Sequence, residues 1–216
     1  MKNKGENIGF LFDLDGVLID SEKEYSRIWS QINKEFPTGV KNLEEVIKGS
    51  TLSKILNDHY ATEEERIKVA KRLHELENQM KYEYLPYARE FLVKLKEHGY
   101  HCALVTSSDN EKMNHLKNEI EDIFEFFEYI VTGDQVKTSK PSPEGYLLAA
   151  HKLNKESNKC VVFEDSLQGV MAGRNSGAYV VGIAGTLPAE KLKDHSNIVI
   201  NSFNELDLDK LIQQLT

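Results

Sequence analysis

Residues 8–18 constrain the fold more than any other part of the chain. Residues 8–12 form a run suited to a buried strand, and Asp13, Asp15 and Gly16 follow it directly. An unbroken apolar run predicts a strand that is covered on both faces, and open α/β sheets bind ligands at the edge where such strands end. Two neighbouring carboxylates repel each other, and a bound cation would offset that repulsion. The alternative is an exposed Asp-x-Asp-Gly turn that only closes the strand.

Strand and helix patterns alternate from residue 86 to the end of the chain. The residue pattern predicts strands at 100–105, 127–131, 160–163, 179–183 and 198–200. Ser108 and Glu111 have the spacing of a capping box, which predicts a helix after the first of these strands. Strands that alternate with helices favour right-handed crossovers. The expected fold class is therefore α/β, with a doubly wound parallel sheet.

Residues 21–85 lack strand-like runs and predict a small helical bundle. Apolar residues recur there at helical spacing, and Thr62 and Glu65 form a second capping-box pattern. Because this segment lies between the first strand and all later strands, we expect a helical cap inserted into the core. The predicted division is a catalytic core of residues 1–20 and 86–216 and a cap of residues 21–85. Hinges are expected at Asp20–Ser21 and near Leu85–Pro86.

Polar residues follow three of the predicted strands. They are Asp13 and Asp15, Thr106 and Ser107, and Glu164 and Asp165. Parallel strands bring these ends to one edge, with Lys140 in a nearby loop. Carboxylates without a neighbouring histidine or cysteine suit Mg²⁺ better than zinc. Hydroxyls and backbone N–H groups before a helix can hold an anion. Together these groups are the parts that phosphoryl transfer requires.

Composition and charge restrict the partners of the chain. Its 216 residues carry a formal net charge of −8, which does not attract nucleic acid or an anionic membrane surface. No apolar stretch approaches the ~18 residues of a membrane span. Cys102 and Cys160 lie in predicted buried strands, and two such thiols favour a reducing, cytoplasmic setting. The sequence does not fix the oligomeric state and is compatible with a monomer.

Four motifs together resemble the haloacid dehalogenase superfamily, and more narrowly its β-phosphoglucomutase-like phosphatases with a helical cap. In chain order they are Asp13-Leu14-Asp15-Gly16-Val17-Leu18, Thr106-Ser107-Ser108, Lys140-Pro141 and Glu164-Asp165-Ser166-x-x-Gly169. The resemblance covers essentially the whole chain. It implies a Rossmann-like core and a small phosphorylated metabolite as substrate.

The resemblance also implies roles for individual residues. Asp13 would be the nucleophile that becomes an aspartyl-phosphate, and Asp15 the general acid and then base. Asp13, the backbone carbonyl of Asp15, and Asp165 would hold Mg²⁺. The predicted phosphate-binding residues are Thr106, Ser107 and Lys140. Glu164 would support Lys140 or the outer shell of the metal.

The residues also discriminate among the reactions of this superfamily. Asp15 favours a phosphatase or phosphomutase over a dehalogenase, because a halide leaves without a proton. Related mutases carry a cap arginine and a cap histidine where this chain has Leu52 and Tyr25. We therefore expect hydrolysis of a small phosphomonoester such as a sugar phosphate. The alternatives are a β-phosphoglucomutase-type phosphomutase and a receiver-like phospho-acceptor module, and the helical insert disfavours the module.

Two further groups of residues have a plain interpretation. The seven histidines are scattered and do not form a ligand pair at helical spacing, so we expect no metal role for them. Gly169, Gly173 and Gly177 recur every four residues, which predicts close packing of a helix on the sheet.

Overall fold

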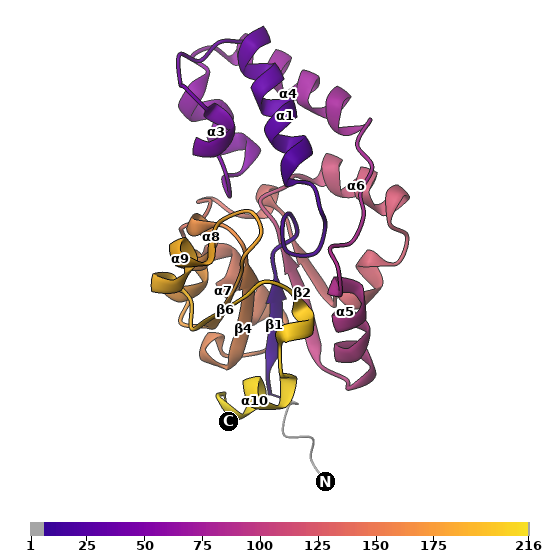
Figure 1. Ribbon diagram of the computed structural model, residues 1–216. Helices are drawn as coiled ribbons and strands as arrows, with labels where there is room; N and C mark the ends of the chain where they lie inside the picture. Colours follow the sequence, from indigo (N-terminus) through magenta and orange to yellow (C-terminus); the bar gives the residue numbers. More distant parts are fainter. Residues whose placement is uncertain (1–6, 216) are drawn as a thin grey trace.

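The sheet of this protein is parallel throughout and lies at the centre of the molecule. The computed structural model describes residues 7–215, so the first residues of the predicted core lie outside it. The strands are β1 (Gly9–Phe12), β2 (His101–Val105), β3 (Tyr129–Val131), β4 (Cys160–Glu164), β5 (Tyr179–Ile183) and β6 (Ile198–Ile200). They follow the order β3-β2-β1-β4-β5-β6 (Figure 1). The predicted α/β fold class is confirmed.

The helices fall into two sets: α5 to α10 pack around the sheet, and α1 to α4 form a separate group at one end of it (Figure 1). They are α1 (Glu22–Glu35), α2 (Leu43–Val46), α3 (Leu52–His59), α4 (Glu63–Glu77), α5 (Ala88–Glu97), α6 (Asn110–Glu119), α7 (Glu144–Lys152), α8 (Leu167–Asn175), α9 (Ala189–Leu192) and α10 (Leu208–Gln213). Short 3₁₀ turns lie at Ile123–Phe126, Gly133–Gln135, Ser157–Lys159, Lys193–His195 and Phe203–Glu205.

Strand β1 is buried on both faces, as its apolar run predicts. Phe10 and Phe12 belong to the core on the side of α5 and α10, and Leu11 belongs to the core on the side of α7 and α8. The rings of Phe12 and Phe163 stack with their centroids 4.5 Å apart. Because β1 pairs with β2 on one side and β4 on the other, its carboxyl end lies between theirs.

Two local predictions differ from the structure. The helix after β2 is capped by Asp109, whose side chain accepts a hydrogen bond from the Lys112 N–H at 3.0 Å, so the predicted Ser108 capping box is wrong. The Ser108 hydroxyl donates to Asp15 instead, at 3.2 Å. Strand β3 begins at Tyr129, because a 3₁₀ turn occupies the residues just before Phe127. The capping box of Thr62 and Glu65 is confirmed.

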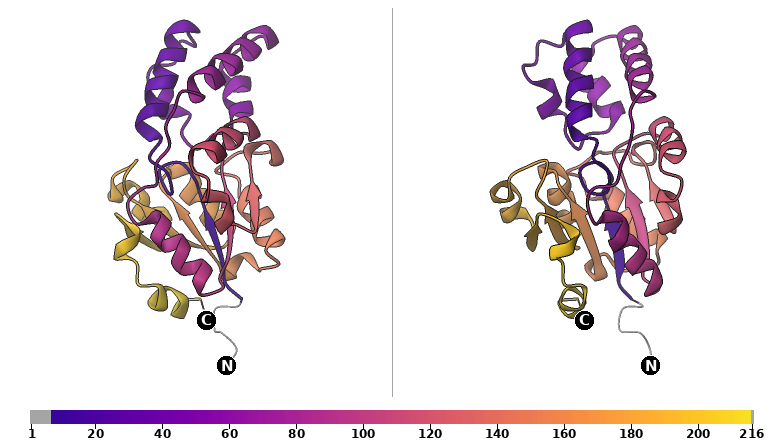
Figure 2. Two further views of the ribbon diagram at one scale, coloured as in Figure 1. Left: turned by 90° about the vertical axis from the view of Figure 1, so that its right-hand side faces the viewer. Right: turned by 45° about the vertical axis from the view of Figure 1, so that its right-hand side comes forward.

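Helices α1 to α4 lie together beyond the carboxyl edge of the sheet (Figures 1 and 2). The chain enters and leaves this group at one place, where Ile19 forms an antiparallel bridge with Tyr84. The Asp20 N–H donates to the Glu83 carbonyl at 3.0 Å, and the Leu85 N–H donates to Leu18 at 2.8 Å. The two linkers therefore run side by side. The division into a cap and a core stays a prediction.

Two observations concern the setting of the protein. Cys102 and Cys160 are buried free thiols. Within residues 7–215, none of the helices has the length and apolar character that crossing a membrane requires. The cytoplasmic location stays a prediction.

Candidate active site

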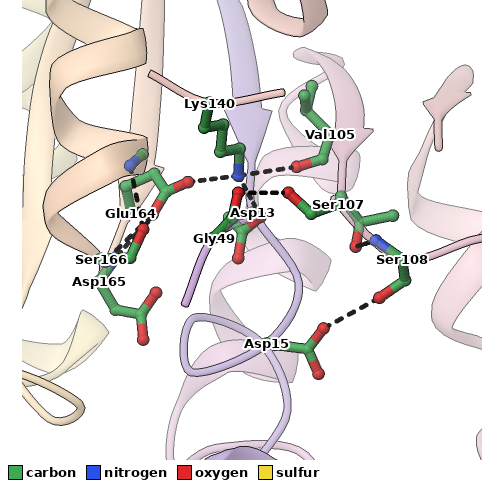
Figure 3. A network of polar contacts seen from close by, with 12 residues as sticks. Asp13, Asp15, Gly49, Val105, Ser107, Ser108, Lys140, Glu164, Asp165 and Ser166 are labelled. Carbon is green, nitrogen blue, oxygen red and sulfur yellow. Dashed lines mark hydrogen bonds and ion pairs between the residues drawn. The ribbon is translucent and has the colours of Figure 1, made fainter. Parts of the chain in front are cut away.

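A buried ion-pair network lies at the carboxyl end of β1. The Asp13 N–H donates to the Phe163 carbonyl at 3.0 Å, so the ladder continues past the strand and fixes the backbone of Asp13. The Lys140 ammonium donates to Oδ1 of Asp13 at 2.5 Å and also to Oε1 of Glu164 (Figure 3). The structure thus brings together residues from β1, β4 and the loop before α7.

Glu164 organises the polar groups on the β4 side of this network. Its side chain is fully buried. It accepts a hydrogen bond from the Tyr146 hydroxyl at 2.8 Å and others from the N–H groups of Asp165 and Ser166, at 3.1 and 3.2 Å. Since these contacts fix the turn after β4 as well as Lys140, Glu164 positions groups on both sides of the site.

Burial and mutual repulsion raise the pKa values of the site carboxyls. Burial raises the pKa of Asp13 to about 8; Lys140 opposes this rise and Glu164 adds to it. Burial, with repulsion from Glu164 and Asp13, also raises the pKa of Asp165 well above its ordinary value. Burial would lower the pKa of Lys140, but the carboxylates of Asp13 and Glu164 outweigh it and raise that pKa. Three acids around one buried ammonium therefore resist full ionisation, and the metal-free site favours the protonated forms of Asp13 and Asp165.

The donor set at this edge fits a divalent cation. One carboxylate oxygen each from Asp13, Glu164 and Asp165 lies within 4.8 Å of the others. Oδ2 of Asp165 is buried and has no hydrogen-bond partner. A Cβ at Gly16, whose φ is +73°, would lie 1.9 Å from that same oxygen, so only glycine leaves it clear. Oxygen ligands of this kind suit a hard ion such as Mg²⁺.

Thr106 and Ser107, the predicted phosphate-binding residues after β2, differ from each other in what they contact. Thr106 extends the sheet through its N–H, which donates to the Val131 carbonyl at 2.9 Å. It lines a small cavity beside Lys140. The Ser107 hydroxyl donates to the Gly49 carbonyl at 2.9 Å and so connects the core to the loop before α3. Phosphate binding by Thr106, Ser107 and Lys140 stays a prediction.

Asp15 lies apart from the Lys140 network, and its side chain is directed toward Ser108 (Figure 3). It also accepts a hydrogen bond from the Ser21 hydroxyl. The ammonium of Lys112 contacts both Asp15 carboxylate oxygens, at 2.6 and 2.5 Å. Sequence reasoning missed Lys112. A signal was present, because a lysine in the first turn of a helix opposes the helix dipole.

A cavity of about 120 Å³ lies between the sheet edge and the first four helices. Asp13, Asp15 and Asp165 line it from below, and its far wall includes Tyr25 and Leu52. Other residues of that wall are Trp29, Ile47, Lys48, Ile55, Leu73 and Glu77. The cavity therefore has three aspartates on its floor, and its roof combines apolar side chains with polar ones that include Glu22, Glu44 and Lys48.

The one lysine of that roof already has partners among the described residues. The ammonium of Lys48 lies 3.4 Å from carboxylate oxygens of both Glu22 and Glu45. A second phosphate in the cavity would thus meet a lysine whose charge is already balanced.

Comparisons with known proteins agree with this geometry. The family model described as haloacid dehalogenase-like hydrolase matches residues 10–183. A phosphorylated carbohydrates phosphatase from Thermotoga maritima is 34% identical over 175 residues, covering 77% of this chain and 80% of the relative. Hexitol phosphatase A from Escherichia coli is 29% identical, with 94% of each chain covered.

A solved structure shares the whole architecture. The crystal structure of β-phosphoglucomutase from Clostridium difficile superposes with a TM-score of 0.80 at 25% identity and covers 96% of both chains. The extent of the family match, together with the strand order and the acidic sheet edge, leads to one conclusion. This chain belongs to the haloacid dehalogenase-like hydrolase family.

Proposed function

We propose that this protein is a Mg²⁺-dependent phosphatase that hydrolyses a small phosphomonoester, a sugar phosphate or similar metabolite, through an aspartyl-phosphate. The observation that carries the proposal is the contact of the Lys140 ammonium with Asp13, 2.5 Å away, beside the carboxylates of Glu164 and Asp165. The names of the relatives, which include phosphatases of carbohydrates and hexitols, support the same reaction class.

The first step transfers the phosphoryl group to the protein. An Asp13 carboxylate oxygen attacks the phosphorus, and the ester P–O bond breaks. Asp15 donates a proton to the departing oxygen, and the leaving group departs as a neutral alcohol. Lys140 holds Asp13 in place and offsets the repulsion between its carboxylate and the anionic ester.

The second step returns the phosphoryl group to water. Asp15, now a carboxylate, accepts a proton from a water molecule whose oxygen attacks the phosphorus. The bond between phosphorus and Asp13 breaks, which releases inorganic phosphate and restores the nucleophile. The nearly enclosed position of Asp13, with 11% of its side chain exposed, limits competing attack by bulk water on the first step.

Asp13, Asp165 and the backbone carbonyl of Asp15 would hold the Mg²⁺ ion. When bound, the ion would neutralise charge on the phosphoryl oxygens and help to orient them. The unpartnered Oδ2 of Asp165 and the space that Gly16 leaves beside it support this assignment.

A phosphomutase is the second candidate, because the β-phosphoglucomutase structure shares the fold over almost the whole chain. The roof of the cavity disfavours it. Leu52 and Tyr25 supply no positive charge, and Lys48 is paired with two glutamates. Among residues 7–215, a bisphosphate intermediate would therefore find no unpaired cation in the roof for its second phosphate.

The test is phosphate release from a panel of sugar phosphates with Mg²⁺ or with EDTA, with Asp13→Asn as the inactive control. We expect turnover only with the metal and the intact Asp13. Rapid quenching should yield a protein that carries one phosphoryl group on Asp13. Conversion of glucose 1-phosphate to glucose 6-phosphate with a bisphosphate primer would favour the mutase instead. Turnover by Asp13→Asn at the wild-type rate would overturn the proposed mechanism.

A further inference from the structure

Lys112 is a buried lysine that the proposed reaction does not use directly. Only 3% of its side chain is exposed. Its ammonium donates to both carboxylate oxygens of Asp15, at 2.6 and 2.5 Å, although 97 positions separate the two residues. The contact therefore joins the first turn of α6 to the loop after β1.

The place of this lysine in its helix is unfavourable in isolation. Lys112 is the third residue of α6, where the helix dipole disfavours a cation. Burying an ammonium also costs free energy unless a partner compensates for the lost hydration. The two-oxygen contact with Asp15 supplies that compensation. Each charge therefore keeps the other in a defined place.

The same ammonium contacts the helical segment above the cavity. It lies 4.2 Å from the centre of the Tyr25 ring and 5.9 Å from the centre of the Tyr82 ring. The Tyr25 hydroxyl donates in turn to Glu77 at 2.5 Å. Tyr25 is on α1, and Glu77 is the last residue of α4. A continuous set of contacts thus runs from Asp15 through Lys112 to two helices of the roof.

We propose that Lys112 is a positioning residue: it fixes the Asp15 carboxylate for proton transfer and, through Tyr25, couples that position to the helices over the cavity. This inference rests on the proposed function, since it assigns Asp15 the acid and base roles. Within residues 7–215, the Asp15 side chain also accepts hydrogen bonds from the hydroxyls of Ser21 and Ser108, which carry no charge. Lys112 is its charged, buried anchor.

The two chemical steps depend on Asp15 to different degrees, which gives a direct test. A nitrophenolate leaves readily as an anion, so transfer from p-nitrophenyl phosphate needs little proton donation. An alkyl phosphate such as glycerol 3-phosphate needs the proton. The second step needs Asp15 as a base for both substrates.

For Lys112→Met, we expect a p-nitrophenol burst at nearly the wild-type rate followed by slower steady-state turnover. Phosphoryl transfer from glycerol 3-phosphate in a single turnover should slow by about 10- to 100-fold, part of the 10²–10⁴ that acid–base catalysis contributes. Lys117→Met, an exposed lysine of the same helix, is the matched control and should leave both rates unchanged. Equal slowing of the first step with both substrates would overturn the proposal.

A double-mutant cycle with Asp15→Asn tests whether Lys112 acts through Asp15. If it does, Lys112→Met costs less than about threefold in that background, because residues that act as a unit are non-additive. Full additivity would overturn the proposal. Lys112→Gln, which keeps a donor, gives the same readout should the methionine variant fold poorly.

The coupling to the roof has its own variant. Tyr25→Leu removes the ring and leaves the Lys112–Asp15 contact in place. We expect the first phosphoryl transfer to slow less than in Lys112→Met, and again more with glycerol 3-phosphate than with p-nitrophenyl phosphate. Equal slowing with both substrates would contradict the proposed coupling to the roof. If the proposed function itself is wrong, the result differs: the wild-type protein releases phosphate from neither substrate.

Discussion

Replacing Gly169 with alanine should damage the site without changing any residue that is proposed to contact the substrate. A Cβ at this position would lie 1.8 Å from Oε1 of Glu164 and 2.1 Å from Oε2, whereas ordinary contact begins at 3.4 Å. The carboxylate would have to retreat by 3.4 − 1.8 = 1.6 Å. The predicted close packing at Gly169 thus occurs against Glu164, a side chain of the candidate active site.

The cost follows from the partners that Glu164 would lose. The carboxylate accepts hydrogen bonds from Lys140, the Tyr146 hydroxyl and two backbone N–H groups. Losing two of these contacts in a buried site costs about 3–6 kcal/mol, at about 1.5–3 kcal/mol for each bond to a charged group. Alanine returns at most about 1 kcal/mol of helix propensity. We expect a net destabilisation of about 2–5 kcal/mol.

Activity should fall together with stability, because Lys140 depends on Glu164 for its position. A displacement of about 1 Å can cost 10²-fold in rate, so we expect kcat/KM to fall by about that factor. Denaturant unfolding and phosphatase kinetics measure the two effects. Gly173→Ala is the control: on the same helix, its Cβ would meet apolar side chains, those of Val162 at 2.9 Å and Val180 at 3.0 Å. Wild-type stability and kcat/KM in Gly169→Ala, or equal activity loss in Gly173→Ala, would refute the reasoning.

Three further predictions concern pH and charge. Burial raises the pKa of Asp13 to about 8. Between pH 3.8 and about 8, the folded metal-free protein therefore keeps a proton on Asp13 that the unfolded chain releases. Its stability should fall as pH rises through this range. On the proposed assignment, Mg²⁺ would displace protons from Asp13 and Asp165, so the gain in Tm on adding Mg²⁺ should be larger near pH 8 than near pH 6; a gain that is independent of pH would contradict this. The hydrogen bond that His74 donates to the Asp109 carboxylate raises the pKa of His74 above 6.5, and the stabilisation present below 6.5 is lost as pH rises through the folded value. An NMR titration should show the raised pKa, with a return toward 6.5 in Asp109→Asn. Lys140→Met leaves buried acids without their cation and should destabilise the protein by about 3–5 kcal/mol in denaturant unfolding, whereas unchanged stability would argue against the buried pair.

The sheet could be predicted because short continuous stretches of sequence determine its strands. Continuous apolar runs mark β1 and β4, and each ends at the carboxylates that the sequence places there. Parallel pairing then forces Asp13 and Asp165 to the same edge, which is why their proximity follows from the sequence alone. The pattern predicts that the third strand begins at Phe127, but β3 begins at Tyr129, because aromatic residues such as Phe126 and Phe127 also suit the 3₁₀ turn and its end.

The unpredicted part of the site depends on how the helical segment docks. Lys112 meets Asp15 only because α6 begins beside the loop after β1, and it meets Tyr25 only because α1 stands above both. Neither the Lys112–Asp15 contact nor the Lys112–Tyr25 contact can be predicted from residue spacing. The spacing of Ser108 and Glu111 matches a capping box and predicts one. The structure uses Asp109 instead, which leaves the Ser108 hydroxyl available to Asp15.

The bridge between Ile19 and Tyr84 has a consequence for the ancestry of such proteins. Because the chain enters and leaves the group of α1 to α4 at this one bridge, residues 20–83 form an excursion that interrupts none of the six strands. A short turn joining these two positions would leave every sheet pairing intact. Genetic insertion, deletion or exchange at this junction can therefore replace the helices over the cavity while the carboxylates at the sheet edge are inherited unchanged.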